Sequence, residues 1–362
     1  MPSFSGQLRA NEIFGVLYNQ IIGQEVFADL VIGGYGSLVE RAKIDGGLHG
    51  DTKLYYDTDA LKSYPWTGDN EAANLFAINR PDDPETQAIV LDIFRQIPVT
   101  IDYYLTKRAW VDEGAFSAFT SVILSWLGNT KKIYDETTYN VFIGTHYTSV
   151  GLQTQSVSLA PVNTPATTAD EEAAARIEGQ KIAEFIANLF SKIKRPSRDY
   201  NDYEFVRSYK ASDLTVIWNA LYVNKMMKVD LPSIFHSEEV MKDLFKEENI
   251  LPEEYFGTVN SAATAGDGSS VRSLIEQEIG SNHYFAGDLI DVGDTAPAGT
   301  SYTQSDEPIC KIVQKLPPYM SSFQVSTTFF NARSLTENHY LTWGHNTLEH
   351  FAGKPFISVN KQ

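Results

Sequence analysis

The segment IVLDIFRQIPVTI, residues 89–101, decides the fold that this sequence predicts. Every second position in it is apolar except one, which is Arg95. Alternation with a period of two predicts a strand that buries one face. Strands in globular domains usually have about five or six residues, and this pattern runs to roughly twice that length. We therefore expect the strand to reach beyond the body of the protein.

The residues before this strand predict a partner for it. Thr52 to Thr58 (TKLYYDT) have the composition of a short strand, and turn-forming residues separate them from residue 89. A long two-stranded ribbon is marginally stable in water, and Pro98 removes one ladder donor, so the ribbon needs a surface to lie against. We expect neighbouring copies of the chain in a lattice to supply it. The side chains expected to make these contacts are Tyr55, Tyr56, Trp66, Phe76 and Phe94. A hairpin folded back over its own core is the alternative.

A long helix is predicted after the ribbon, because the apolar period changes from two to about 3.6 after Trp110. Asp112 is placed to cap this helix, and basic residues lie in its C-terminal half, where cations favour a helix. A helix from Asp112 to Glu136 would be about 40 Å long at a rise of about 1.5 Å per residue. Gly128 is the candidate point for a bend. The expected apolar stripe is Phe116, Phe119, Val122, Ile123, Trp126, Leu127, Ile133 and Tyr134.

The other elements are shorter or separated by loops. Thr168 and Glu171 form a capping box for a second long helix, which ends near Ile193 before a basic run. Further helices are expected at residues 11–22 and 238–247, a buried strand at 214–218 passing into a helix, and a strand at 323–329. A polar linker is expected at residues 149–168 and a loop-rich region at 257–306.

The composition excludes several classes of protein. Asp and Glu total 46 against 29 Lys and Arg, a net charge of −17, whereas a nucleic-acid reader would normally be basic. The acidic balance suits simple solubility, and it also suits the lining of a DNA container, which should repel its contents mildly. The one cysteine, Cys310, excludes an intrachain disulfide and is expected to be buried. We expect no secretory signal and no membrane span.

Candidate chemistry is sparse in this sequence. His339, His345 and His350 form the one histidine cluster, but Glu349 precedes its histidine, so the pattern of a zinc protease is absent. No nucleophile elbow and no phosphate-binding loop occurs. We expect no catalytic residue, no cofactor and no metal. A soluble enzyme that holds a metal near His339, His345 and Glu349 is the alternative.

Two stretches carry a resemblance to a known family. LDIFRQIPVTIDYYLTKRAWVDEGAFSAFTSVILSW (Leu91 to Trp126) is similar to the junction of ribbon and spine helix in major capsid proteins of small short-tailed (podovirus-type) bacteriophages. FFNARSLTENHYLTWGHN (Phe329 to Asn346) is similar to their C-terminal region. The resemblance implies an α+β fold of the Hong Kong ninety-seven capsid type. Its parts would be an N-terminal arm (1–48), an extended β-hairpin loop (49–101), a peripheral domain with the spine helix (102–147), an axial domain (148–309) and a return to the peripheral domain (310–362).

The same resemblance implies a function without catalysis. The chain would self-assemble in pentamers and hexamers into the icosahedral or prolate head of a virion, in the host cytoplasm, with a scaffolding protein and a portal as partners. That shell would enclose double-stranded DNA without reading its sequence. Some family members crosslink a lysine of the extended loop to a neighbour, but no motif identifies a partner for Lys53 or Lys62, so we expect no crosslink. An encapsulin-type shell of the same fold is the alternative.

Overall fold

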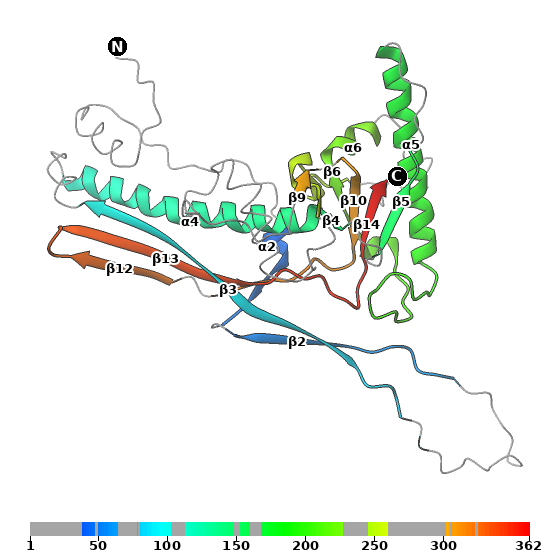
Figure 1. The fold of residues 1–362 in the computed structure, drawn as a ribbon, viewed down its shortest axis with the longest axis horizontal. Helices are drawn as coiled ribbons and strands as arrows, with labels where there is room; N and C mark the ends of the chain where they lie inside the picture. The colour runs from blue at the N-terminus through cyan, green and yellow to red at the C-terminus, as the bar shows by residue number, and fades with distance from the viewer. Residues whose placement is uncertain are drawn as a thin grey trace, which may run out of the picture.

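The computed structural model describes residues 38–47, 50–63, 78, 80–102, 113–147, 153–159, 168–226, 245–259, 302–304, 306–322 and 325–362. Within these ranges the chain is an α+β structure with three sheets and two long helices (Figure 1). The helix predicted at residues 11–22 lies outside the described residues, as does most of the one predicted at 238–247. Of the latter, residues 245–247 are described, and the last of them begins a 3-10 turn (Glu247–Asn249).

The long alternating segment forms a single strand of 18 residues, β3 (Glu85–Asp102). Its first part pairs antiparallel with β2 (Thr52–Asp57), which makes the predicted hairpin. Its second part pairs antiparallel with β13 (Thr336–Asn346), on the edge opposite to β2. One strand therefore belongs to the hairpin at one end and to the main sheet at the other, and the predicted loop range 49–101 includes residues of both.

A β-bulge lies where β3 changes partner. A register shift between His345 and Asn346 of β13 leaves one extra residue, Asp92, in β3. The Asp92 carboxylate accepts hydrogen bonds from the Thr347 backbone N–H at 2.7 Å and from the Thr347 hydroxyl at 2.5 Å. Bulges bend a strand and increase its twist, so this one sets the direction in which the hairpin leaves the sheet.

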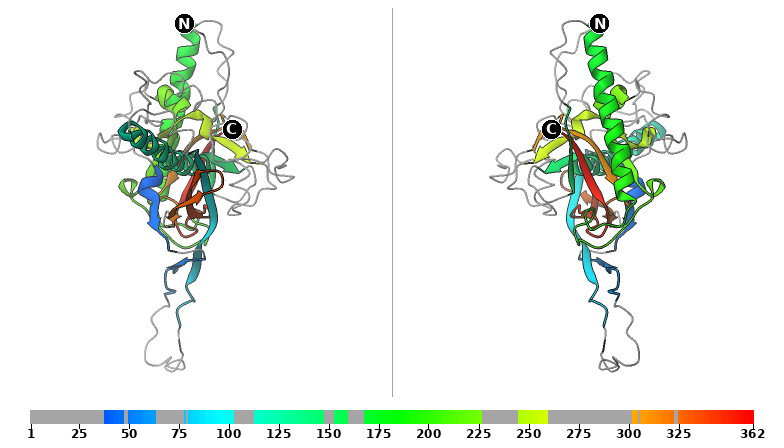
Figure 2. Two further views of the ribbon diagram at one scale, coloured as in Figure 1. Left: turned by 90° about the vertical axis from the view of Figure 1, so that its left-hand side faces the viewer. Right: turned by 90° about the vertical axis from the view of Figure 1, so that its right-hand side faces the viewer.

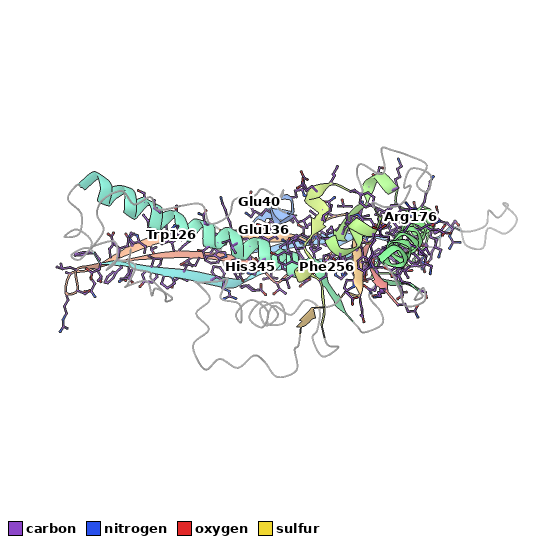
Figure 3. The ribbon with its side chains drawn as sticks, turned by 90° about the horizontal axis from the view of Figure 1, so that it is seen from above. Glu40, Trp126, Glu136, Arg176, Phe256 and His345 are labelled. Atoms are coloured by element: carbon purple, nitrogen blue, oxygen red, sulfur yellow. The ribbon has the colours of Figure 1, made fainter. Side chains whose placement is uncertain are left out.

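The main sheet has six strands, in the order β1, β11, β13, β3, β2, with β12 also paired to β13. The helix α4, of 32 residues, runs lengthwise along β3 and β13, as the view from above shows (Figure 3). It contacts the sheet through Tyr134, whose ring lies 5.6 Å from that of Trp343. The remaining elements of this unit are β1 (Lys43–Asp45), β11 (Tyr319–Ser321), β12 (Val325–Asn331), α2 (Leu38–Ala42) and α4 (Glu113–Gly144).

The prediction for α4 was right in position and too short at its C-terminal end. The helix continues past Glu136 to Gly144 and is continuous through Gly128. Residues 137–144 include β-branched residues and asparagine, which are weak helix formers. Tyr139, Val141 and Ile143 are buried in the core below the helix, so tertiary packing stabilises this last part.

The second unit is a sheet of five strands in the order β5, β14, β10, β6, β7, packed against α5. Its core contains Ile182 and Ile186 of α5 and Trp218 of β6, and it is a separate cluster from the one below α4. The elements are β5 (Thr154–Val157), α5 (Thr168–Ile193), a 3-10 turn (Ala211–Asp213), β6 (Thr215–Asn219), α6 (Ala220–Met226), β7 (Ile250–Leu251), β10 (Pro308–Val313) and β14 (Phe356–Lys361).

Short strands interrupt the two stretches that were predicted to be linker or loop. β5 lies inside the predicted linker and pairs parallel with β14. A small third sheet joins β4 (Thr145–Tyr147), β8 (Gly257–Val259) and β9 (Tyr302–Gln304), after a 3-10 turn at Glu253–Tyr255. Strands of three or four residues are too short to show a period in the sequence.

Two glycines of α4 provide a test of its packing. A Cβ at Gly144 would lie 2.0 Å from the carbonyl oxygen of Tyr255, whereas a Cβ at Gly128 would meet nothing within 4 Å. We expect Gly144→Ala to lower the free energy of unfolding by about 1–3 kcal/mol, because the backbone of Tyr255 has to move. Gly128→Ala should instead raise it by about 0.5–1 kcal/mol, because alanine loses less entropy in a helix. Urea unfolding of the unassembled chain measures both, and effects of equal sign would contradict the close approach of α4 to Tyr255.

Candidate assembly interface

The hairpin and the adjoining part of β3 expose an apolar surface, which we call the hairpin outer face. It is defined by Leu54, Tyr56 and Val90 of the hairpin and by Phe94, where β3 pairs with β13. Their exposed fractions are 52%, 65%, 39% and 44%. Burial alternates along both strands, so these residues share the face that points away from the chain's own core. The Phe94 ring lies against Gly344 of β13, where an added Cβ would come 2.9 Å from the ring atom Cζ. The outer face is therefore a surface of large apolar side chains carried mainly by two paired strands.

The root of the hairpin, which we define as β2, residues 58–59 and β3 up to Val90, is fixed to the body by two ion pairs. The Arg207 guanidinium lies 2.5 Å from the Asp57 carboxylate at the end of β2. The Arg198 guanidinium lies 2.8 Å from the Asp59 carboxylate, which also accepts a hydrogen bond of 2.8 Å from the Val206 backbone N–H. The backbone hydrogen bonds of Val206 and Ala60, with the Arg198 charge, hold the pKa of Asp59 below its ordinary value.

The segment after β13 contacts both strands of the root. The Gln87 amide of β3 donates to the carbonyl of His350 at 2.8 Å and accepts from the Ala352 N–H at 3.1 Å. The Tyr55 ring makes an edge contact with Phe351, with ring centroids 5.0 Å apart. Because both strands are fixed at the root, the hairpin projects from the body in a defined direction (Figure 2).

The five predicted contact residues fall into three groups. Tyr56 and Phe94 lie on the hairpin outer face. Tyr55 points to the opposite side, where it packs against its own chain at the root. Trp66 and Phe76 lie outside the described residues. Sequence reasoning missed Leu54 and Val90. Leu54 lies two residues before Tyr56 in the same strand, so the two side chains share a face, and this spacing was the available signal.

The residues of the alternative metal site are not brought together. His345 is buried below α4, with one ring nitrogen 3.0 Å from the Tyr134 hydroxyl and the other 2.9 Å from the Asn346 carbonyl oxygen. Burial lowers the pKa of His345 and raises that of Glu349, which lies beside Gln87 at the hairpin root. His339 lies 3.8 Å from Glu337. Among the described residues, no group of three or more His, Cys, Asp or Glu side chains could hold a metal ion.

The two lysines considered for crosslinking have partners within the chain. Lys53 donates to the backbone carbonyl of Asp45, and Lys62 lies 3.3 Å from the Asp82 carboxylate. Cys310 is buried in β10, and burial raises the pKa of its thiol. None of the helices in the described ranges has the length and apolar character needed to cross a membrane.

Comparison with known proteins gives matches among solved structures. No protein-family model and no curated protein matches the sequence. A chain in the capsid structure of Staphylococcus phage Andhra is 10% identical, with a TM-score of 0.56, over 100% of this chain and 94% of that chain. A chain in the structure of the head fiber and inner core protein gp22 of native bacteriophage P68 is 9% identical, with a TM-score of 0.59, over 94% of this chain and 88% of that chain.

The chain therefore has the fold of a bacteriophage capsid structure. At identities this low the matches show the fold alone. They extend over 100% and 94% of this chain. The α+β capsid fold that the segments 91–126 and 329–346 predict is confirmed.

The ion pair at the hairpin root gives a first test of the site. Arg207→Gln removes a charge-assisted hydrogen bond, which is worth about 1.5–3 kcal/mol, so the hairpin should open more often. We expect amide hydrogen exchange of residues 52–57 to become about tenfold faster or more, because about 1.4 kcal/mol corresponds to a factor of ten. Arg333→Gln, in the exposed turn after β12, is the control with the same charge change. Exchange rates that are the same in both variants would show that the pair does not hold β2.

The pair of Asp202 and His350, behind the root, gives a test by pH. Burial would raise the pKa of Asp202, but the hydrogen bond and charge of His350, 2.5 Å away, and a hydrogen bond from Gln153 lower it overall. A carboxyl with a lowered pKa stabilises the fold above its ordinary pKa of 3.8 and loses this effect as the pH falls through the folded value. We expect Asp202→Asn to weaken the fall of Tm below about pH 4. The exposed Asp213→Asn should leave that fall unchanged.

Proposed function

We propose that the chain is the major capsid protein of a tailed bacteriophage, a shell subunit that self-assembles into the head around double-stranded DNA. The observation that carries this proposal is the hairpin outer face: large apolar side chains on a projecting arm whose root is fixed to the body. The full-length similarity in fold to a phage capsid structure supports the same conclusion.

The physical reason is the cost of leaving this face in water. Burial stabilises by about 25 cal/mol per Å² of apolar surface, and a hairpin that offers such a surface is marginal by itself. A neighbouring subunit that covers Leu54, Tyr56, Val90 and Phe94 removes that cost. Because the root is fixed within the subunit, little further conformational entropy is lost when the arm docks.

The other expected contacts follow from this arrangement. Trp66 and Phe76, between β2 and β3 in sequence, are proposed to extend the contact with the neighbour. Tyr55 is proposed to act by positioning the hairpin through Phe351. The main partners are neighbouring copies in pentamers and hexamers, together with a scaffolding protein and a portal. The protein assembles in the host cytoplasm and is then part of the virion. The net charge of −17 favours a wall that does not adhere to the packaged phosphates.

The test replaces the apolar face by charge. We expect the double variant Leu54→Asp, Tyr56→Asp to lower the share of chain that sediments as particles about tenfold or more, because a buried, unpaired carboxylate costs several kcal/mol. The control, Leu54→Met with Tyr56→Phe, keeps the apolar area and should assemble like the wild type. Both proteins are expressed with the neighbouring genes and examined by sedimentation and negative-stain microscopy.

Each outcome of that experiment decides one question. Equal yields of particles from the charged and apolar variants would show that the outer face makes no shell contact. A wild-type chain that stays monomeric with all neighbouring genes present would overturn the proposed function. Particles that hold an enzyme cargo and no DNA would favour the encapsulin-type shell. Thermal unfolding of the unassembled variants checks that they keep the fold.

A further inference from the structure

The strand β12 forms an open edge of the main sheet. All seven of its residues, Val325 to Asn331, are exposed, and each pairs on one side with β13. In the part of the chain that the structure describes, no strand pairs with its other side. An edge strand of this length presents a row of unpaired backbone groups, and proteins normally protect such edges with lysine, proline or a bulge. The sequence VSTTFFN contains no lysine or proline, and its ladder with β13 has no register shift.

Large apolar side chains lie on both faces of this edge. Phe329 is 62% exposed and Phe330 is 52% exposed. Adjacent residues of a strand point to opposite faces, so a partner lying on one face of the sheet would cover only one of the two rings. An added strand covers both, because its own side chains alternate in the same way. The edge is thus suited to strand addition.

The charge of the chain indicates which partner fits. Charged residues make up 21% of the sequence and the net charge is −17, so two copies of this chain repel each other in most orientations. β12 carries no charged residue. A charged partner would therefore form no ion pair along this strand, whereas a second copy would meet no like charge there, which favours a second copy of the chain.

We propose that β12 of one copy pairs antiparallel with β12 of a second copy, about a two-fold axis that passes through Thr328. This pairing would join the two main sheets edge to edge, and it rests on the proposed function in that a shell places many copies side by side. In this register Phe329 faces the partner's Thr327, and Phe330 faces the partner's Ser326. Each ring lies beside a small side chain on the same face, and no pair of like charges arises. The same patch serves both copies, as a two-fold interface requires.

Cysteine substitution tests the register directly. In the proposed pair the two Thr328 residues are directly opposite, with Cα atoms about 4.5–5.5 Å apart, which is within the range of a disulfide. Ser326, on the same face, is the matched control, because its two copies would lie more than about 13 Å apart along the strands. The native Cys310 is buried, so the new thiol is the accessible one. Thr328→Cys and Ser326→Cys are assembled with the neighbouring genes and treated with oxidised glutathione, which takes up the two electrons of each disulfide formed.

The readout is the band at twice the 40.4 kDa chain mass on a non-reducing gel, from both particles and unassembled protein. We expect this dimer to be about tenfold more abundant for Thr328→Cys than for Ser326→Cys, given the difference in Cα separation. Shells without the Thr328→Cys dimer, or equal dimer from both variants, would overturn the pairing and leave the proposed function intact. No shells at all would overturn the function, and the dimer in unassembled protein would then decide the pairing alone.

Discussion

The ladder of β3 is the constraint on which the rest of the structure depends. A two-stranded arm cannot hold a direction in water by itself. Here the strand that forms one side of the arm continues into the main sheet and pairs there with β13 along the rest of its length. The orientation of the arm is therefore decided by the register of β3 against β13, by the bulge at Asp92 and by the contacts at the root.

A buried polar network fixes the helix α4 to the main sheet that contains β3. The Asp135 carboxylate accepts hydrogen bonds from Lys131 at 2.6 Å and from the Tyr319 hydroxyl at 2.7 Å, and the Tyr134 hydroxyl lies 3.0 Å from His345 of β13. Buried charges are stable only when their partners are in place, so this network requires one alignment of helix and sheet. It also accounts for His345, which sequence reasoning considered as a metal ligand.

The sequence predicted best where a pattern is long and local. The alternation from Ile89 to Ile101 and the helical period after Trp110 each persist over many residues, so β3 and α4 were found. What sequence could not give was the partner of β3 in the main sheet, because β13 lies more than two hundred residues further along the chain. The sequence also could not decide which of Tyr55 and Tyr56 points toward the body of the protein. Both faces of β2 carry an aromatic ring, and only the contact with Phe351 decides which one is buried.

The arrangement of β2 and β13 on opposite edges of β3 has a mechanical consequence. A pull along the arm is transmitted through β3 to a ladder whose strands run parallel to the force. Strands pulled in this direction must slide past each other, and all of their hydrogen bonds share the tension at once. A ladder pulled from the side would instead open one bond at a time. A pull on the arm thus loads the main sheet in shear and does not unzip it.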